Sequence, residues 1–198
     1  MITDSPGGGE IRSRTRVYEG RLFHFDDATV AYEGEELNRQ WVVHPGSVSV
    51  LALDEQDRVV VLQQYRAPVD AHCWELPAGC LDVPGEDGLA TAKRELAEET
   101  DLTAAEWSTL VDASATSGSS DEIFRVYLAT GLAPAASNYE RTGEEAHMTV
   151  TRVPFADLLD AVLNLRVLDG ATQLGVLALD ARRRRGLSPL PAEAPRVI

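Results

Sequence analysis

The 198-residue sequence has few cysteines, few basic residues and no long hydrophobic run. No stretch approaches the roughly 18 apolar residues that a membrane-spanning helix needs, and residues 1–9 lack the basic and apolar regions of a signal peptide. We therefore expect a cytoplasmic protein with no membrane partner. Disulfides are rare in that compartment, so Cys73 and Cys80 are expected to be ordinary thiols rather than a disulfide or a metal-binding pair.

Basic residues are outnumbered, with 18 Lys and Arg against 32 Asp and Glu, which gives a formal net charge of −14. Such a charge repels nucleic acid unless a local basic patch offsets it. The one basic cluster, residues 182–185, follows an apolar helical stretch and precedes Gly186. Cations at a helix C-terminus oppose the helix dipole. The cluster is therefore expected to end a helix, and no nucleic-acid partner is predicted.

The composition is typical of a globular protein, with 44% hydrophobic and 25% charged residues. The length suits one domain with an additional arm. Residues 1–10 and 188–198 contain clustered glycine or proline and are predicted to be flexible. Residues 11–45 predict a small antiparallel β arm, and residues 46–187 the main domain. Pro45-Gly46 marks the boundary, because this pair interrupts regular structure.

Hydrophobic periodicity predicts the individual elements. In the arm, short strands are expected at residues 16–18, 22–25, 29–32 and 39–43. In the main domain, strands are expected at residues 48–53, 59–64, 123–128 and 148–153, and helices at residues 89–102, 155–165 and 171–185. Strands and helices alternate without a regular βαβ repeat, which favours a mixed α+β sandwich over a doubly wound sheet.

The helix predicted over residues 89–102 is strongly acidic. Between Asp82 and Glu106 there are eight acidic and two basic residues. Glu95, Glu98 and Glu99 are spaced i, i+3 and i+4, which places them on one helix face. Like charges at these spacings destabilise an isolated helix, so a counter-charge is expected nearby. Mg²⁺ takes carboxylate oxygens as ligands; the ordinary alternative is a solvated charged face.

The segment from Gly79 to Leu102 resembles the Nudix box, G-x5-E-x7-R-E-U-x-E-E-x-G-U, where U is aliphatic. The matching residues are Gly79, Glu86, Arg94, Glu95, Leu96, Glu98, Glu99 and Leu102. Six residues rather than five separate Gly79 from Glu86, and Asp101 replaces a glycine that ends the helix. Asp adopts a left-handed backbone more readily than most residues. Neither departure removes a carboxylate.

This resemblance implies a Nudix-type α/β/α sandwich with a mixed β-sheet. It also implies hydrolysis of nucleoside diphosphates linked to another moiety, with Mg²⁺ or Mn²⁺ as the cofactor. The metal ligands that it implies are Glu95, Glu98, Glu99 and the carbonyl of Ala78, and Glu98 is also a candidate catalytic residue. Glu86 is expected to support the site. Arg94 is expected to orient the glutamates through charge-assisted hydrogen bonds.

Within that family, four segments resemble ADP-ribose pyrophosphatases: residues 39–46, 64–66, 74–79 and 119–122. The resemblance implies cleavage of ADP-ribose to AMP and ribose 5-phosphate. It also implies a homodimer in which the arm is exchanged and both subunits contribute to each site. Candidate substrate contacts are Arg39, Trp41, Arg66, Glu75 and Ser120. Trp41 or Tyr65 could stack on adenine, although aromatic residues of strands more often pack in the core.

The catalytic base in this subfamily often lies on a late loop. Residues 139–147 form a polar segment in which Glu145 is the first candidate and Glu144 the second. The alternative is that both are exposed loop residues, since geometry decides a general base before pKa does.

Two other functions stay open. One is hydrolysis of a different nucleoside diphosphate sugar, and the other is a non-catalytic sensor that binds ADP-ribose without turnover. A sensor is expected to have an eroded glutamate set, whereas here Glu95, Glu98 and Glu99 are all present.

Overall fold

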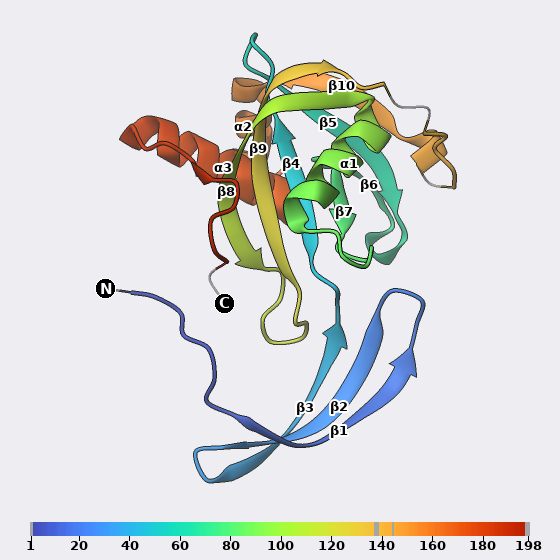
Figure 1. The fold of residues 1–198 in the computed structure, drawn as a ribbon, viewed down its shortest axis with the longest axis vertical. Helices are drawn as coiled ribbons and strands as arrows, with labels where there is room; N and C mark the ends of the chain where they lie inside the picture. The colour runs from blue at the N-terminus through green and yellow to red at the C-terminus, as the bar shows by residue number, and fades with distance from the viewer. Residues whose placement is uncertain (1, 137–138, 144, 197–198) are drawn as a thin grey trace.

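The computed structural model describes residues 2–136, 139–143 and 145–196, with only the backbone of Glu145. It has two parts, a main domain and an N-terminal β arm that projects from it (Figure 1). Of the helices among these residues, none is both long enough and apolar enough to cross a membrane.

The arm is a three-stranded antiparallel meander of β1 (Glu10–Glu19), β2 (His24–Tyr32) and β3 (Glu35–Val43), as predicted. The runs at residues 22–25 and 29–32 were expected to be separate strands. This detail is wrong, because β2 runs without a break from His24 to Tyr32 and includes the end of the first run and all of the second. Asp26, in the middle of β2, is only 1% exposed. Its carboxylate is bound by Arg14 and Arg16 of the adjacent β1, which lets a charged residue continue the strand.

The main domain contains two sheets. One has the order β11-β8-β9-β4-β7 and the other the order β10-β5-β6. Only the β4–β9 pair is parallel among the described strand pairs. The strands are β4 (Ser47–Ala52), β5 (Arg58–Arg66), β6 (Ala71–Glu75), β7 (Ala78–Cys80), β8 (Leu102–Ser114), β9 (Ile123–Pro134), β10 (Thr149–Pro154) and β11 (Leu190–Pro191).

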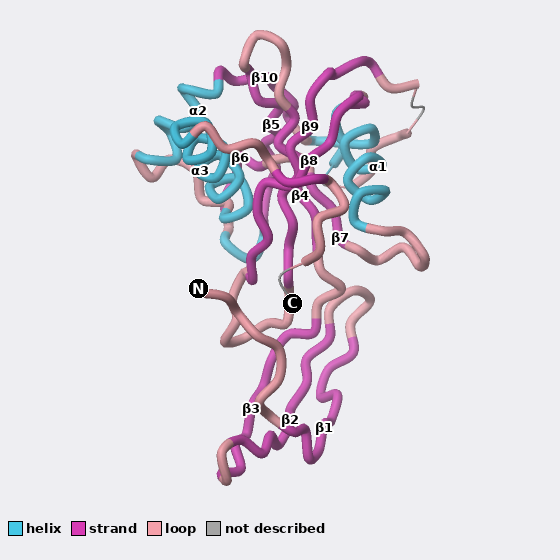
Figure 2. Tube along the Cα trace, turned by 60° about the vertical axis from the view of Figure 1, so that its left-hand side comes forward, coloured by secondary structure: helices cyan, strands magenta, loops and turns pink. Residues whose placement is uncertain are grey.

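Helices cover both sides of these sheets. Helix α1 (Gly88–Thr100) lies on one side, and α2 (Phe155–Leu163) and α3 (Gly170–Arg185) lie on the other (Figure 2). Successive side chains of a strand point to opposite faces, so Val50 of β4 packs in the cluster beneath α1 while Leu51 packs beneath α2 and α3. This confirms the predicted α+β sandwich. It also explains the continuous apolar runs at residues 50–53 and 59–62.

The ends of α1 and α3 follow the expected chemistry. Gly186 ends α3 with φ 62°, directly after the four arginines 182–185. Asp101 ends α1 with φ 58°, the left-handed conformation expected there. Helix α1 is shorter than predicted, because Leu102 already begins β8. Strands β6, β7 and β8 were not predicted. The first two are short, and a register shift between Thr109 and Val111 interrupts the alternation of β8.

The C-terminal residues were expected to be flexible, but the described part packs on the main domain. Strand β11 pairs with β8. Arg125 donates from Nη1 to the carbonyls of Ala192 (3.4 Å) and Ala194 (2.8 Å). Arg125 itself forms two hydrogen bonds, of 2.6 and 2.7 Å, with Asp112, and both side chains are 5% exposed. A buried ion pair therefore holds this segment.

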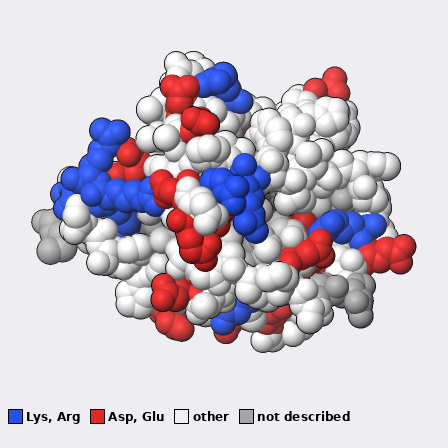
Figure 3. Space-filling view, turned by 90° about the horizontal axis from the view of Figure 1, so that it is seen from above, with Lys and Arg blue, Asp and Glu red and all other residues white. Residues whose placement is uncertain are grey.

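Charges of both signs are mixed on the surface. On the face shown in Figure 3, basic side chains lie next to acidic ones. Arginines of the 182–185 cluster form such pairs, Arg183 with Asp57 and Arg184 with Asp180. The cluster is thus partly neutralised by its neighbours.

Candidate active site

Helix α1 is anchored by local capping and by a buried stripe. The Asp87 carboxylate accepts a hydrogen bond of 2.8 Å from the Ala90 backbone N–H, which satisfies one free donor of the first turn. Ala92 and Leu96 are fully buried. These contacts fix the rotation of the helix, so that the glutamates beside the buried stripe face the preceding loop and β7.

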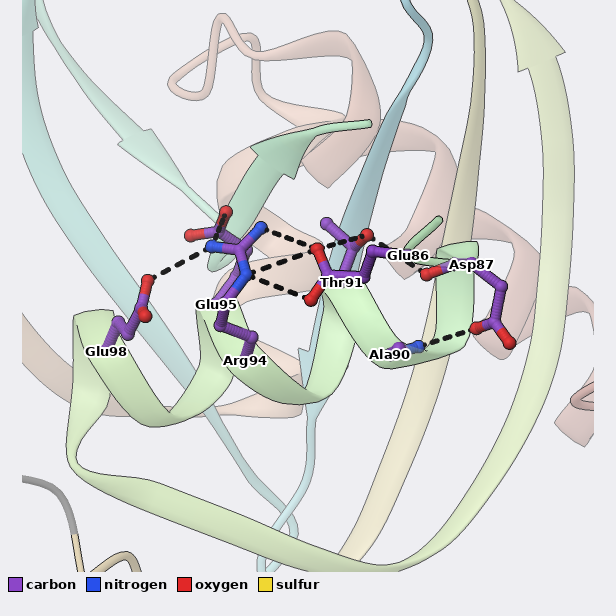
Figure 4. Close-up of polar contacts among 7 residues, drawn as sticks. All are labelled: Glu86, Asp87, Ala90, Thr91, Arg94, Glu95 and Glu98. Atoms are coloured by element: carbon purple, nitrogen blue, oxygen red, sulfur yellow. Dashed lines mark hydrogen bonds and ion pairs between the residues drawn. The ribbon is translucent and has the colours of Figure 1, made fainter. Parts of the chain in front are cut away.

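Arg94 is the centre of an acidic cluster (Figure 4). Its Nη2 donates to Glu86 at 3.0 Å, and its Nη1 donates to Glu95 at 2.7 Å and to Glu98 at 3.1 Å. The Glu86 contact lowers the pKa of that carboxyl group and raises the pKa of Arg94. One cation thus faces three carboxylates, and the cluster keeps a formal charge of −2.

Glu99 is held separately. It is only 6% exposed, and its Oε2 accepts a hydrogen bond of 2.9 Å from the Ala78 backbone N–H. Glu95 approaches the next residue of β7 so closely that a Cβ at Gly79 would lie 2.0 Å from the Glu95 Oε1. The glycine is therefore required by the position of Glu95. These contacts bring the predicted ligands Ala78, Glu95 and Glu99 together, and Arg94 joins Glu98 to them.

The donor set suits a hard divalent cation, because it consists of carboxylate and carbonyl oxygens. In the part of the chain that the structure describes, no three acidic, histidine or cysteine residues lie close enough together to hold a metal ion. Arg94 provides part of the counter-charge that these carboxylates need, through its bonds to Glu95 and Glu98.

Ala78 and Gly79 also line a cleft of about 520 Å³, a volume typical of small-molecule sites. Arg66 enters this cleft from the end of β5. Both of its hydrogen bonds to Glu75, of 2.8 and 2.6 Å, are formed by the guanidinium fork, and they raise the pKa of Arg66. Glu75 is 5% exposed and also accepts from Gln64 at 3.1 Å. Glu75 thus orients Arg66, which remains 43% exposed in its side chain.

The other predicted substrate contacts lie elsewhere in this chain. Arg39, Trp41 and Ser120 line a separate hollow of about 340 Å³ between the arm and the loop at residues 117–121. The guanidinium of Arg14 lies 5.1 Å from the centre of the Trp41 ring. The Ser120 hydroxyl accepts from the Glu122 backbone N–H at 3.1 Å. The structure therefore does not bring Arg39 or Trp41 to the Arg66 cleft of their own chain.

Sequence reasoning gave His44 no role, although it lines the cleft. Its Nδ1 accepts from the Gly46 N–H at 2.9 Å, its Nε2 lies 3.6 Å from Glu122, and Phe23 stacks on its ring at 4.7 Å. Residues 42 and 120 pair as a β-bridge, which brings two segments distant in sequence together. That pairing is not visible in the sequence, although residues 39–46 and 119–122 both carry the resemblance to ADP-ribose pyrophosphatases.

Two remaining expectations concern the two cysteines and the candidate catalytic base. Both cysteines are free, and burial raises the pKa of the Cys80 thiol to about 11, so it is protonated at neutral pH. Glu145 begins the 3-10 helix Glu145–His147, but its side chain lies outside the described residues, as does all of Glu144.

Comparison with known proteins agrees with this geometry. A family model for the NUDIX domain matches residues 43–170. An ADP-ribose pyrophosphatase of Mycobacterium tuberculosis is 40% identical over 93% of this chain and 89% of its own length. A methanol dehydrogenase activator of Bacillus methanolicus is 31% identical over 81% of this chain and 86% of its own. The crystal structure of an ADP compounds hydrolase superimposes with a TM-score of 0.72 at 17% identity, covering 94% of this chain and all of that one. The chain is therefore a member of the Nudix family.

Proposed function

We propose that the protein hydrolyses the pyrophosphate bond of ADP-ribose to give AMP and ribose 5-phosphate. The observation that carries the proposal is the meeting of Glu95 and Glu99 with Ala78 and Gly79 at the wall of the Arg66 cleft. The name of the relative at 40% identity, an ADP-ribose pyrophosphatase, supports the substrate. Relatives with other names share the family, so the substrate has to be tested directly.

Mg²⁺ is the proposed cofactor, with Mn²⁺ as a substitute. The residues that would hold it are Glu95, Glu98, Glu99 and the carbonyl of Ala78. When bound, a divalent cation lowers the pKa of a coordinated water and offsets the charge of the diphosphate. The excess of negative charge around Arg94 supports this assignment, because one guanidinium cannot neutralise three carboxylates.

Arg66 is proposed to bind the diphosphate. Its guanidinium is fixed by Glu75 yet partly open to the cleft, and a planar guanidinium can bind phosphate oxygens with two parallel bonds. Glu75 acts through Arg66, since both of its carboxylate oxygens are already hydrogen-bonded. Glu145 is proposed to accept the proton of the attacking water. Glu144 is the second candidate, and Glu98 is an alternative.

A homodimer is proposed to complete the site. Strand β1 is exposed along its whole length, and the arm carries exposed apolar residues such as Val17 and Tyr18. Arg39, Trp41 and Ser120 lie in a hollow apart from the Arg66 cleft. An arm exchanged between two copies would allow Arg39 and Trp41 to contact substrate bound by the other copy.

The test is hydrolysis of a panel of nucleoside diphosphate compounds by the purified protein with Mg²⁺, with AMP and ribose 5-phosphate quantified as products. ADP-ribose is expected to give the highest kcat/KM. A preference for another nucleoside diphosphate sugar would mean that this compound, and not ADP-ribose, is the substrate. Tight ADP-ribose binding without products would indicate a sensor.

A glutamate variant tests the site itself. Glu99→Gln is expected to lower kcat by at least about a hundredfold, because it removes charge where the transition state needs it, and to weaken Mg²⁺ binding measured by calorimetry. The matched control is Glu106→Gln on β8, an exposed glutamate whose carboxylate contacts Thr130. Equal turnover in the two variants would contradict the proposed mechanism.

A further inference from the structure

The segment between β9 and β10 returns twice to the C-terminal end of α1. At its start, the Ala135 N–H donates to the carbonyl of Asp101 at 2.8 Å. Six residues later, Arg141 donates from Nε to the carbonyl of Glu98 at 2.9 Å and from Nη2 to the carboxylate of Asp101 at 2.5 Å. Asp101 thus binds both ends of residues 135–141, once through its backbone and once through its side chain.

Asp101 is also the residue that departs from the Nudix pattern. Its φ of 58° and ψ of 32° lie in the left-handed region, which glycine adopts at lower cost. Glycine would keep the backbone bond to Ala135 but has no carboxylate. The contact with Arg141 is therefore what the aspartate adds at this position.

Arg141 acts on the part of α1 that carries the site. It binds the carbonyl of Glu98, and the Glu98 side chain contacts Arg94. The next residue, Glu99, holds Ala78. A cation near the last carbonyls of a helix also interacts favourably with the helix dipole. The Arg141 side chain is 26% exposed, which places it partly within the protein surface.

We propose that Arg141 and Asp101 are positioning residues for the hydrolysis, an inference that rests on the proposed function. Their contact, together with the bond from Ala135 to Asp101, holds Ala135 and Arg141 at the last turn of α1. No described residue between Pro134 and Glu145 belongs to a helix or strand, so Ala135 and Arg141 are held by their contacts with the end of α1. The segment leads directly into the 3-10 helix that begins at the candidate base Glu145.

Breaking the contact between Arg141 and Asp101 is expected to lower kcat rather than to weaken substrate binding. Neither residue lines the cleft, so the loss of their contact leaves KM within about twofold while the catalytic groups become less well ordered. Because the pair is partly exposed, kcat is expected to fall only about three- to tenfold.

The experiment compares Asp101→Gly, Arg141→Gln and the double variant in the full-length protein. Asp101→Gly removes the carboxylate and retains the left-handed turn, so the fold is preserved. The double variant is expected to lose no more kcat than the more affected single variant, because both changes break one contact. Asp101→Asn keeps a hydrogen-bond acceptor without the charge and should fall between wild type and Asp101→Gly.

The chain contains a closely matched control. Asp57 has the same φ of 58°, its carbonyl accepts from the Phe155 N–H at 2.8 Å, and its 56% exposed carboxylate binds Arg183 at 2.6 Å. It does not line the cleft. Asp57→Gly therefore makes the same chemical change elsewhere, and its kcat is expected to equal that of wild type.

Amide hydrogen exchange provides a readout that does not depend on activity. Asp101→Gly is expected to increase exchange across residues 135–143, and Asp57→Gly is not. Unchanged exchange and kcat in Asp101→Gly, or single losses that multiply in the double variant, would overturn the inference. If wild type did not hydrolyse ADP-ribose, the proposed function would fail, while the exchange experiment would still decide whether the contact orders the segment.

Discussion

Two arginines of this protein bind carboxylates in opposite ways. Arg125 is matched one to one with Asp112, and both side chains are 5% exposed. Arg94 is 28% exposed and faces Glu86, Glu95 and Glu98, which are 14–25% exposed. The first arrangement is neutral and holds the C-terminal residues on the sheet. The second keeps excess negative charge at the edge of a cleft, so it favours the arrival of a further cation. Charge balance, rather than the presence of an ion pair, distinguishes the Arg125 pair from the Arg94 cluster, which is the proposed metal site.

The largest expected effect on stability comes from breaking the balanced pair. Asp112→Asn leaves Arg125 buried without a counter-charge, which is expected to lower the free energy of unfolding by about 3–5 kcal/mol. Urea denaturation measures this change. Asp180→Asn breaks the exposed pair with Arg184 and should cost less than about 1 kcal/mol. Similar losses in the two variants would show that burial does not distinguish the pairs.

A change in the Arg94 cluster is expected to lower the activity rather than the stability of the protein. Gly79→Ala places a methyl group 2.0 Å from the present position of the Glu95 Oε1, so the Glu95 side chain must move. A displacement of about 1 Å in a catalytic group can cost roughly a hundredfold in rate. Steady-state kinetics should show such a fall in kcat. A melting temperature within a few degrees of wild type would separate this effect from unfolding, and full activity would contradict the close approach.

Arg94→Met tests the positioning role of the arginine. The variant leaves the glutamates in place but removes the bonds that orient Glu95 and Glu98. Loss of a residue that orients metal ligands typically costs about 10–100-fold in metal affinity or activity, and we expect about tenfold here. Titration of kcat against Mg²⁺ concentration measures it. Tighter Mg²⁺ binding in the variant would mean that Arg94 competes with the metal rather than arranging its ligands.

The sequence predicted the local placement of the helix glutamates better than the long-range contacts of the chain. Glu95, Glu98 and Glu99 follow from helical spacing, which is a local property, and the left-handed turn at Asp101 follows from residue type. The contacts of Arg125 with Ala192 and Ala194 could not be predicted, since they join residues about 70 positions apart. Strand β8 was missed for a local reason, because its register shift breaks the two-residue period on which strand prediction depends.

The smallest expected effect is the pH dependence of the stability that Glu86 contributes. Arg94 lowers the pKa of this carboxyl group below its usual value of 4.5. A carboxyl group whose pKa is lower in the folded state contributes stability above its unfolded pKa and loses it as pH falls through the folded value. Wild type should therefore melt above Glu86→Gln at pH about 7, and the difference should shrink as pH falls below about 4.5. A melting difference that stayed constant down to pH about 3 would mean that Glu86 contributes through packing rather than through its charge.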